Sequence, residues 1–261
     1  MLLLPLVMVG VFAGIARAEL QSHRAVYTFK LASASAGSDI VNITGAMRLA
    51  MEQTCDGWVM AQDIDMDLST AIGDVIRNQL RFAAWESASG LEYDFVVRNR
   101  VGDVPDNIRG HASIPSRTEE GAADFREPEA QSFSLPAETL FPVQHLIRIL
   151  AAAKAGTNQV SHMAFDGTYV QGPLRAVTFI GGRLMPDATK VKTFGTLLDS
   201  VGWNIRLAYF DPEQKDGTPT VEIEIYQLEN GVSPKLLLDY GTFSTTVELV
   251  SIESIKPPVC S

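Results

Sequence analysis

Two cysteines are the residues with the most easily defined chemistry. Cys55 and Cys260 are the only cysteines of the chain. In an oxidising compartment they can form one intramolecular disulfide, which would close a loop of about 200 residues and stabilise the fold by about 5 kcal/mol in the entropic model. Two free or intermolecular thiols are the alternative. A redox-active pair is disfavoured because there is no Cys-x-x-Cys motif, and two isolated cysteines make a weak metal site.

The other residue types that carry catalysis form no recognised motif. The sequence has no Gly-x-Ser-x-Gly, no Gly-x-x-x-x-Gly-Lys phosphate loop, no Gly-x-Gly-x-x-Gly and no His-Glu-x-x-His. The neighbouring carboxylates Glu119 and Glu120 could act as general acid and base, but with 31 acidic residues such pairs are expected by chance. We therefore predict no catalytic residue, no cofactor and no bound metal. The four histidines are scattered without ligand spacing: His23, His111, His145 and His162.

A run of alternating aspartates resembles the start of a calcium loop. Asp63, Asp65 and Asp67 have the required spacing, but Leu68 stands where the loop needs glycine, and Asp74 stands where a bidentate glutamate is expected. Because apolar residues fill the alternate positions, the pattern indicates the solvated face of a β-strand.

The N-terminal stretch has the pattern of a secretory signal peptide. Residues 2–15 are nearly all apolar and are followed by Ala16-Arg17-Ala18, an Ala-x-Ala cleavage pattern before Glu19. We predict a signal peptide over residues 1–18 and one β-rich domain over residues 19–261. An N-terminal membrane anchor is the alternative, although the run is too short for an ordinary transmembrane helix. No later segment approaches a membrane span, so the mature protein is expected to be soluble and exported.

Composition excludes two classes of partner. The chain is 46% apolar and 20% charged, which is ordinary for a globular protein, and its formal net charge is -10. Nucleic-acid binding needs cations that face phosphates, and electrostatic docking on anionic lipid needs the same excess of basic residues. We expect neither partner.

Most of the chain shows the two-residue period of β-strands. In residues 24–31, Ala25, Tyr27, Phe29 and Leu31 share one face. Residues 98–110 look polar and turn-rich, Gly181-Gly182 looks like a turn, and residues 109–133 leave room for two or three short strands. Further strands are predicted over residues 41–50, 58–62, 77–85, 91–98, 160–165, 174–180, 203–210, 221–228, 235–240 and 243–255.

One segment has helical spacing. Pro142 suits the first helical position, apolar residues follow at intervals of three and four, and Gly156 suits the C-terminal cap. We predict one main α-helix near residues 142–155 in a mainly β, antiparallel domain. His145 lies in the first turn of this helix, and we interpret it as a partly buried packing residue rather than a catalytic one.

Several short blocks, in this order, resemble the EipB-type cell-envelope integrity proteins of Gram-negative bacteria. The resemblance runs from about residue 22 to the C-terminus, and one departure is Thr242, where family members often carry an acidic residue. The blocks are residues 22–27, 55–58, 85–90, 93–95, 140–145, 165–167, 230–234 and 238–241, with Cys260 at the end.

This resemblance implies a periplasmic protein that keeps the envelope intact, with a strongly curved antiparallel sheet described as a β-spiral or open barrel-like sheet. It also implies a Cys55–Cys260 disulfide and no known reaction. We therefore expect a noncatalytic binding or scaffolding protein whose partner is a periplasmic protein or a lipid or other envelope component. A carrier of a lipid or acylated protein is the alternative, and an envelope hydrolase with a dispersed site, built around His145 or His23, is a third hypothesis.

Overall fold

The computed structural model describes residues 20–214 and 217–260, so the predicted signal peptide lies outside the described residues. The described chain forms an antiparallel sheet of fourteen strands with two α-helices and a short 3-10 helix. The elements are β1 (His23–Ala34), β2 (Ile40–Gln53), β3 (Gly57–Thr70), β4 (Val75–Ser87), β5 (Glu92–Val101), β6 (Val104–Ser113), β7 (Gly121–Glu127), β8 (Gln131–Leu135), α1 (Pro142–Lys154), β9 (Gln159–Ala164), β10 (Leu174–Leu184), α2 (Ala188–Phe194), η1 (Thr196–Leu198), β11 (Gly202–Phe210), β12 (Val221–Leu228), β13 (Lys235–Asp239) and β14 (Phe243–Ser254).

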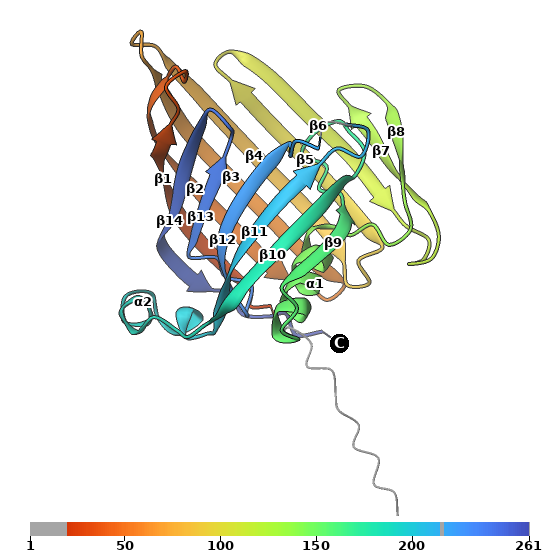
Figure 1. Ribbon diagram of the computed structural model, residues 1–261. Helices are drawn as coiled ribbons and strands as arrows, with labels where there is room; N and C mark the ends of the chain where they lie inside the picture. Colours follow the sequence, from red (N-terminus) through yellow and green to blue (C-terminus); the bar gives the residue numbers. More distant parts are fainter. Residues whose placement is uncertain (1–19, 215–216, 261) are drawn as a thin grey trace, which may run out of the picture.

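The strand order divides the sheet into two meanders that meet at β1 and β14. The order is β8-β7-β6-β5-β4-β3-β2-β1-β14-β13-β12-β11-β10-β9, so among the described strands only β1 and β14 pair without being consecutive in sequence. The sheet curls until β2–β8 face β9–β13 across an interior, as Figure 1 shows. It does not close, because β8 and β9 remain at its two edges.

Alternation along each strand decides which side chains face the interior. In β1, Ala25, Tyr27 and Phe29 are buried as predicted, whereas Arg24 and Lys30 are exposed. Register carries this pattern across the sheet, because Tyr27 lies opposite Met47 of β2. The inner face is therefore continuous and largely apolar.

The aspartates of β3 lie on the outer face. Asp63 is 3.3 Å and Asp65 is 2.9 Å from the guanidinium of Arg81, and Asp67 is 2.8 Å from that of Arg77. The interpretation of this run as a solvated strand face is confirmed.

The segment before α1 extends one edge of the sheet. Leu140 donates its N–H to the carbonyl of Met163 (2.8 Å) and accepts a hydrogen bond from the N–H of Phe165 (3.0 Å). The helix then begins at Pro142 and ends at Lys154, as its periodicity predicted. It lies at one end of the curl, between the two walls of the sheet (Figure 1).

A carboxylate from a distant strand caps α1. Both oxygens of Glu86, on β4, accept hydrogen bonds from the first turn of the helix, from the N–H of Val143 (2.7 Å) and of Gln144 (2.9 Å). Phe141, at the N-cap position, offers no side-chain hydrogen bond. Glu86 is fully buried, and this burial raises its pKa to about 7, although the two hydrogen bonds act in the opposite direction.

The end of the curl that holds α1 is tied together covalently and by ion pairing. Cys55, in the β2–β3 turn, is bonded to Cys260 after β14, with 5.6 Å between their Cα atoms, so the predicted disulfide is confirmed. Lys154 Nζ lies 2.6 Å from Glu229 Oε1, which joins the last turn of α1 to the β12–β13 loop. We call this the closed end, and the opposite end, with the β3–β4 and β5–β6 turns, the open end.

Two local predictions were wrong, and one short helix was missed. Residues 98–110 form the end of β5 and most of β6, with only residues 102 and 103 in the turn between them. Gly181-Gly182 is not a turn: β10 continues to Leu184 and absorbs the glycines as an irregularity in its register with β11. The short helix α2 was not predicted. No helix within residues 20–214 and 217–260 combines the length and the apolar character that crossing a membrane requires.

Candidate functional site

One part of the interior is filled by aromatic rings. We call this group the aromatic core, and its ring centroids lie 5.1 to 6.4 Å apart in stacked and edge-on pairs. The Tyr93 hydroxyl donates a hydrogen bond to the carbonyl of Asp166 (2.9 Å). Gly110 and Gly167 leave space for the ring of Phe95, since a Cβ at either position would collide with that ring. The aromatic core consists of Tyr93, Phe95, Phe125, Phe133, Phe141 and Phe165.

Another part of the interior is not filled by side chains. We call it the apolar chamber, and its volume is about 350 Å³. It lies between the inner faces of β1–β3 and those of β12–β14, with Leu146 of α1 at the closed end. Its walls include Phe29, Met47, Leu49, Ile64, Leu236 and Leu238.

The walls of the apolar chamber are accessible to solvent although they face inward. Leu49, Ile64, Leu236 and Leu238 are only half-buried, in contrast to the aromatic core, whose rings are fully buried except that of Phe133. None of the described residues that line the chamber is Asp, Glu, Lys or Arg. An apolar surface of this kind, kept away from charge, favours a hydrocarbon ligand. Sequence reasoning did not select these residues, because their alternating apolar pattern is shared by strands whose side chains fill the interior.

Neutral polar groups lie at the closed end of the chamber. His23 is buried and its Nδ1 lies 2.7 Å from the carbonyl of Gln21, so Nδ1 must carry the proton and donate. Burial lowers the pKa of His23, and the hydrogen bond to Gln21 opposes this change. The Gln227 side chain donates to the carbonyls of Leu228 and Val232 and accepts from Ser233. None of these groups adds a charge at neutral pH.

Two histidines predicted to be scattered lie side by side. The rings of His145 on α1 and His162 on β9 have centroids 5.6 Å apart in an edge-on arrangement, and Tyr209 of β11 is 6.5 Å from His145. His145 is buried as expected, and burial, with a smaller effect of His162, lowers its pKa to about 4. Neither histidine is hydrogen-bonded to a carboxylate among the described residues, so this pair lacks the orientation that a general base requires.

The remaining candidates do not converge on a site. His111 lies on the outer face, 3.1 Å from Glu92 and 3.0 Å from Asp94. Glu119 accepts a hydrogen bond from Ser116 (2.7 Å) and is not part of a catalytic pair with Glu120 among the described contacts. Within the part of the chain that the structure describes, no three His, Cys, Asp or Glu side chains are grouped to hold a metal.

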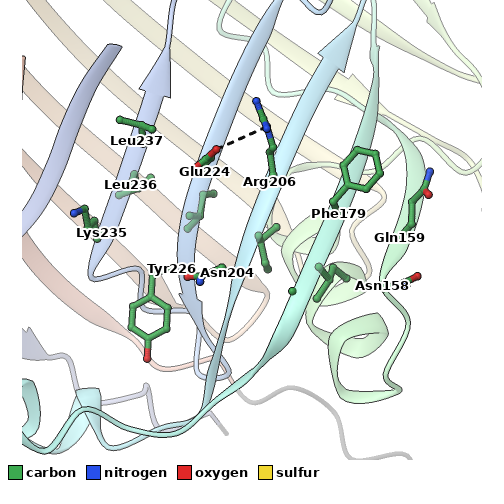
Figure 2. Close-up of a pocket in the computed structure, with 14 residues that line it drawn as sticks. Asn158, Gln159, Phe179, Asn204, Arg206, Glu224, Tyr226, Lys235, Leu236 and Leu237 are labelled. Atoms are coloured by element: carbon green, nitrogen blue, oxygen red, sulfur yellow. Dashed lines mark ion pairs between the residues drawn. The ribbon is translucent and has the colours of Figure 1, made fainter. Parts of the chain in front are cut away.

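A depression with a larger volume than the apolar chamber, about 630 Å³, lies outside the sheet, over β10–β13. Figure 2 shows Phe179, Arg206, Glu224 and Leu237 on neighbouring strands along it. Its charges are already paired, since Arg206 lies 3.8 Å from Glu224 and Lys235 lies 3.4 Å from Glu248. We therefore regard the apolar chamber as the candidate binding site and this depression as ordinary outer surface.

Comparison with known proteins defines the class. A family model described as EipB-like matches residues 15–256, and the chain therefore belongs to the EipB-like family.

Among individual proteins, the chain is 28% identical over 257 residues to the cell envelope integrity protein EipB of Brucella abortus (strain 2308), covering 93% of this chain and 88% of the relative. It also matches a crystal structure from Brucella abortus described as a beta-barrel-like protein of a domain of unknown function. That match has a TM-score of 0.84 and 24% identity, and it covers 91% of this chain and 99% of the other. The mainly β, open barrel-like architecture predicted from the sequence is thereby confirmed.

Proposed function

We propose that this protein supports the integrity of the cell envelope by noncatalytic binding, and that the apolar chamber is its binding site. Membership of the EipB-like family and the likeness to a protein named for cell envelope integrity support the role. One observation carries the binding part: the curved sheet lines about 350 Å³ of apolar interior without filling it.

The ligand class follows from the chemistry of the chamber walls. Binding pockets for small molecules have volumes of roughly 300–1,000 Å³ and are mostly apolar. An apolar cavity of about 150 Å³ is already large enough to bind benzene, so the chamber can hold a longer hydrocarbon. An acyl chain of a lipid or of an acylated protein fits a chamber with aliphatic walls and no charged lining residue. The protein would then be a carrier or sensor of acyl groups.

The noncatalytic part of the proposal rests on the histidines. Among the described residues, neither His145 nor His23 is hydrogen-bonded to a carboxylate and a hydroxyl, which a dispersed hydrolase site would need. The low pKa of His145 also makes it a weak base. These observations favour binding over envelope hydrolysis.

The compartment is a separate element of the proposal. A disulfide is stable in the periplasm and other oxidising compartments, and the bonded pair of Cys55 and Cys260 supports export through the predicted signal peptide. Cell fractionation should find the protein in the periplasm with residues 1–18 removed. Recovery in the cytoplasm with an intact N-terminus would contradict this.

The binding proposal is tested by two neighbouring residues of β13. Leu236 points into the chamber, whereas Leu237 points to the outer face. In the variant Leu236→Trp the larger side chain occupies the chamber, and we expect at least a tenfold loss of affinity for a neutral fluorescent apolar probe such as N-phenyl-1-naphthylamine. The matched control Leu237→Trp should bind within twofold of the original chain.

The role in envelope integrity is tested in cells. Deletion of the gene should sensitise cells to detergent and to cell-wall antibiotics, and Leu237→Trp should restore resistance while Leu236→Trp should not. Mass spectrometry of the protein purified from cells should detect a bound acyl compound. Equal probe binding by both variants, or no binding by the original chain, would refute the chamber as the site.

A further inference from the structure

A second, smaller cavity adjoins the apolar chamber at α1. We call it the polar pocket; its volume is about 210 Å³ and it lies between α1 and strands β9–β12. His145, Asp166, Tyr209 and Gln171 contribute polar groups to its lining. It therefore differs from the apolar chamber in chemistry, although both belong to the same interior.

Three polar rings gather beside the polar pocket, around a small residue that is not part of its lining. Ala176 of β10 lies opposite His162 of β9 on one side and opposite Tyr209 of β11 on the other. His145 of α1 packs against both of these rings, so three polar rings surround the short side chain of Ala176. Thr178 is the next inward position of β10, beside this group.

Polar atoms at this place have no hydrogen-bond partner within the described residues. They are Nε2 of His145, which lines the polar pocket, and Nδ1 of His162 and Oγ1 of Thr178, which lie on the neighbouring strands β9 and β10 outside its lining. These are three of the five buried orphan side-chain atoms of the described structure. The Tyr209 hydroxyl also makes no hydrogen bond to a described residue. A buried polar group without a partner is destabilising, so the orphan nitrogen of His145 and the Tyr209 hydroxyl, whose residues both line the pocket, indicate a place where another molecule can form hydrogen bonds.

The charges around the polar pocket select against anions. Burial lowers the pKa of both His145 and His162, with Arg148 adding to the effect at His162 and Glu138 opposing it, so both rings are neutral at pH 7. The Asp166 carboxylate, which accepts hydrogen bonds from the backbone and hydroxyl of Thr168, lines the pocket. No Lys or Arg is among the described lining residues. A neutral group that both donates and accepts hydrogen bonds suits these surroundings.

The two cavities meet at α1 and β12. Leu146 lines both of them, and the consecutive inward residues Ile223 and Ile225 of β12 line the apolar chamber and the polar pocket, respectively. The two cavities are therefore neighbours, and a ligand that occupies both must pass the side chain of Leu146.

We propose that the interior binds one uncharged amphiphile, with its acyl chain in the apolar chamber and an ester, amide or hydroxyl group in the polar pocket. This inference rests on the proposed function, because it assumes that the apolar chamber binds hydrocarbon. The inference adds a ligand selectivity to that function: the interior should bind a neutral acyl compound more tightly than a free fatty acid of the same chain length.

The test compares two competitors that differ in their head group. N-phenyl-1-naphthylamine bound to the full chain is displaced either with 1-monolauroylglycerol, which is neutral, or with laurate, which is anionic. We expect the monoacylglycerol to bind at least tenfold more tightly than laurate. The double variant His145→Leu, His162→Leu should lose at least tenfold of this affinity while binding the naphthylamine within twofold of the original chain.

A matched control and the contrary outcomes separate the two proposals. His111→Leu, on the outer face, should change neither affinity. If the two competitors bind equally, or if the double variant keeps its affinity for the monoacylglycerol, the polar pocket has no role and the proposed function still stands. If the original chain binds neither the naphthylamine nor the monoacylglycerol, both proposals fail. Circular dichroism of each variant verifies that the sheet is retained.

Discussion

Among the inward side chains of β5 and β7, the rings of Tyr93, Phe95 and Phe125 are fully buried, whereas the aliphatic side chains Leu49, Ile64, Leu236 and Leu238 of β2, β3 and β13 are only half-buried. Both groups belong to the same sheet and face the same interior. In the aromatic core, rings from β5 and β7 reach Phe141 and Phe165 on the opposite side. In the apolar chamber, Leu238 and Ile64 are too short to reach across, so a cavity remains between them.

This difference separates two tasks within one fold. The aromatic core has the close packing that stabilises a protein interior. The apolar chamber is less closely packed, and its apolar surface is therefore available to a ligand. Stability and binding can therefore be changed independently, and the following predictions test how far this separation extends.

The largest effect on stability is expected from the disulfide at the closed end. Replacing both Cys55 and Cys260 by serine removes a link across 205 residues, and the entropic model gives a loss of about 5 kcal/mol in the free energy of unfolding, with strain reducing it. Urea denaturation of the variant and of the oxidised original chain measures this difference. An unchanged midpoint would show that the chamber walls are held in place without the bond.

The next largest change in the free energy of unfolding is expected in the aromatic core, and it is compared with a matching substitution in the apolar chamber. Phe95→Ala in the aromatic core should lower the free energy of unfolding by about 3–5 kcal/mol, because the removed ring leaves a cavity in close packing. Leu238→Ala in the apolar chamber should cost about 1 kcal/mol, because this side chain is only half-buried and already borders a cavity. Denaturation curves provide both values. Similar losses would contradict the separation of a packed and an open part.

A smaller effect distinguishes the two buried titratable groups at the start of α1. Folding raises the pKa of Glu86 from 4.5 to about 7, so Glu86 contributes stability at low pH that is lost as the pH rises through 7. Folding lowers the pKa of His145 from 6.5 to about 4, so His145 contributes stability above pH 6.5 that is lost as the pH falls toward 4. Each pKa shift changes the free energy of unfolding by about 3 kcal/mol. Between pH 4.5 and 6.5 the two pH dependences have opposite signs and nearly cancel.

Replacing either residue should reveal the pH dependence of stability that the other residue contributes. Relative to the original chain, Glu86→Gln should become less stable by about 3 kcal/mol more at pH 4.5 than at pH 7.5, whereas His145→Leu should shift in the opposite direction. Chemical denaturation of all three proteins at both pH values gives these differences. If both variants retain the pH dependence of the original chain, the two groups do not titrate in this range.

Much of the fold could be predicted from local sequence patterns. The two-residue period located most strands, and Pro142 with the apolar spacing after it located α1. The alternation around Asp65 was sufficient to reject a calcium loop. These features depend on a few neighbouring residues, and for this reason the sequence shows them directly.

The site could not be predicted, because it depends on contacts between distant residues. Alternating apolar residues look alike whether the side chains opposite them are aromatic or aliphatic, so the chamber has no local signature. Glu86 caps a helix that begins 56 residues later in the chain, and the meeting of His145 with His162 requires α1 to fold back over β9. The error at Gly181-Gly182 has the same origin, because pairing with β11 keeps these glycines extended.

The placement of β1 and β14 side by side has a consequence for the order of assembly. Each meander can form from neighbouring hairpins, but the two are joined only when β14 pairs with β1, more than 200 residues away along the chain. Until that pairing forms, both inner faces are exposed and the chamber has only one wall. The binding site therefore depends on this one long-range pairing, as does the register that brings Cys260 to Cys55.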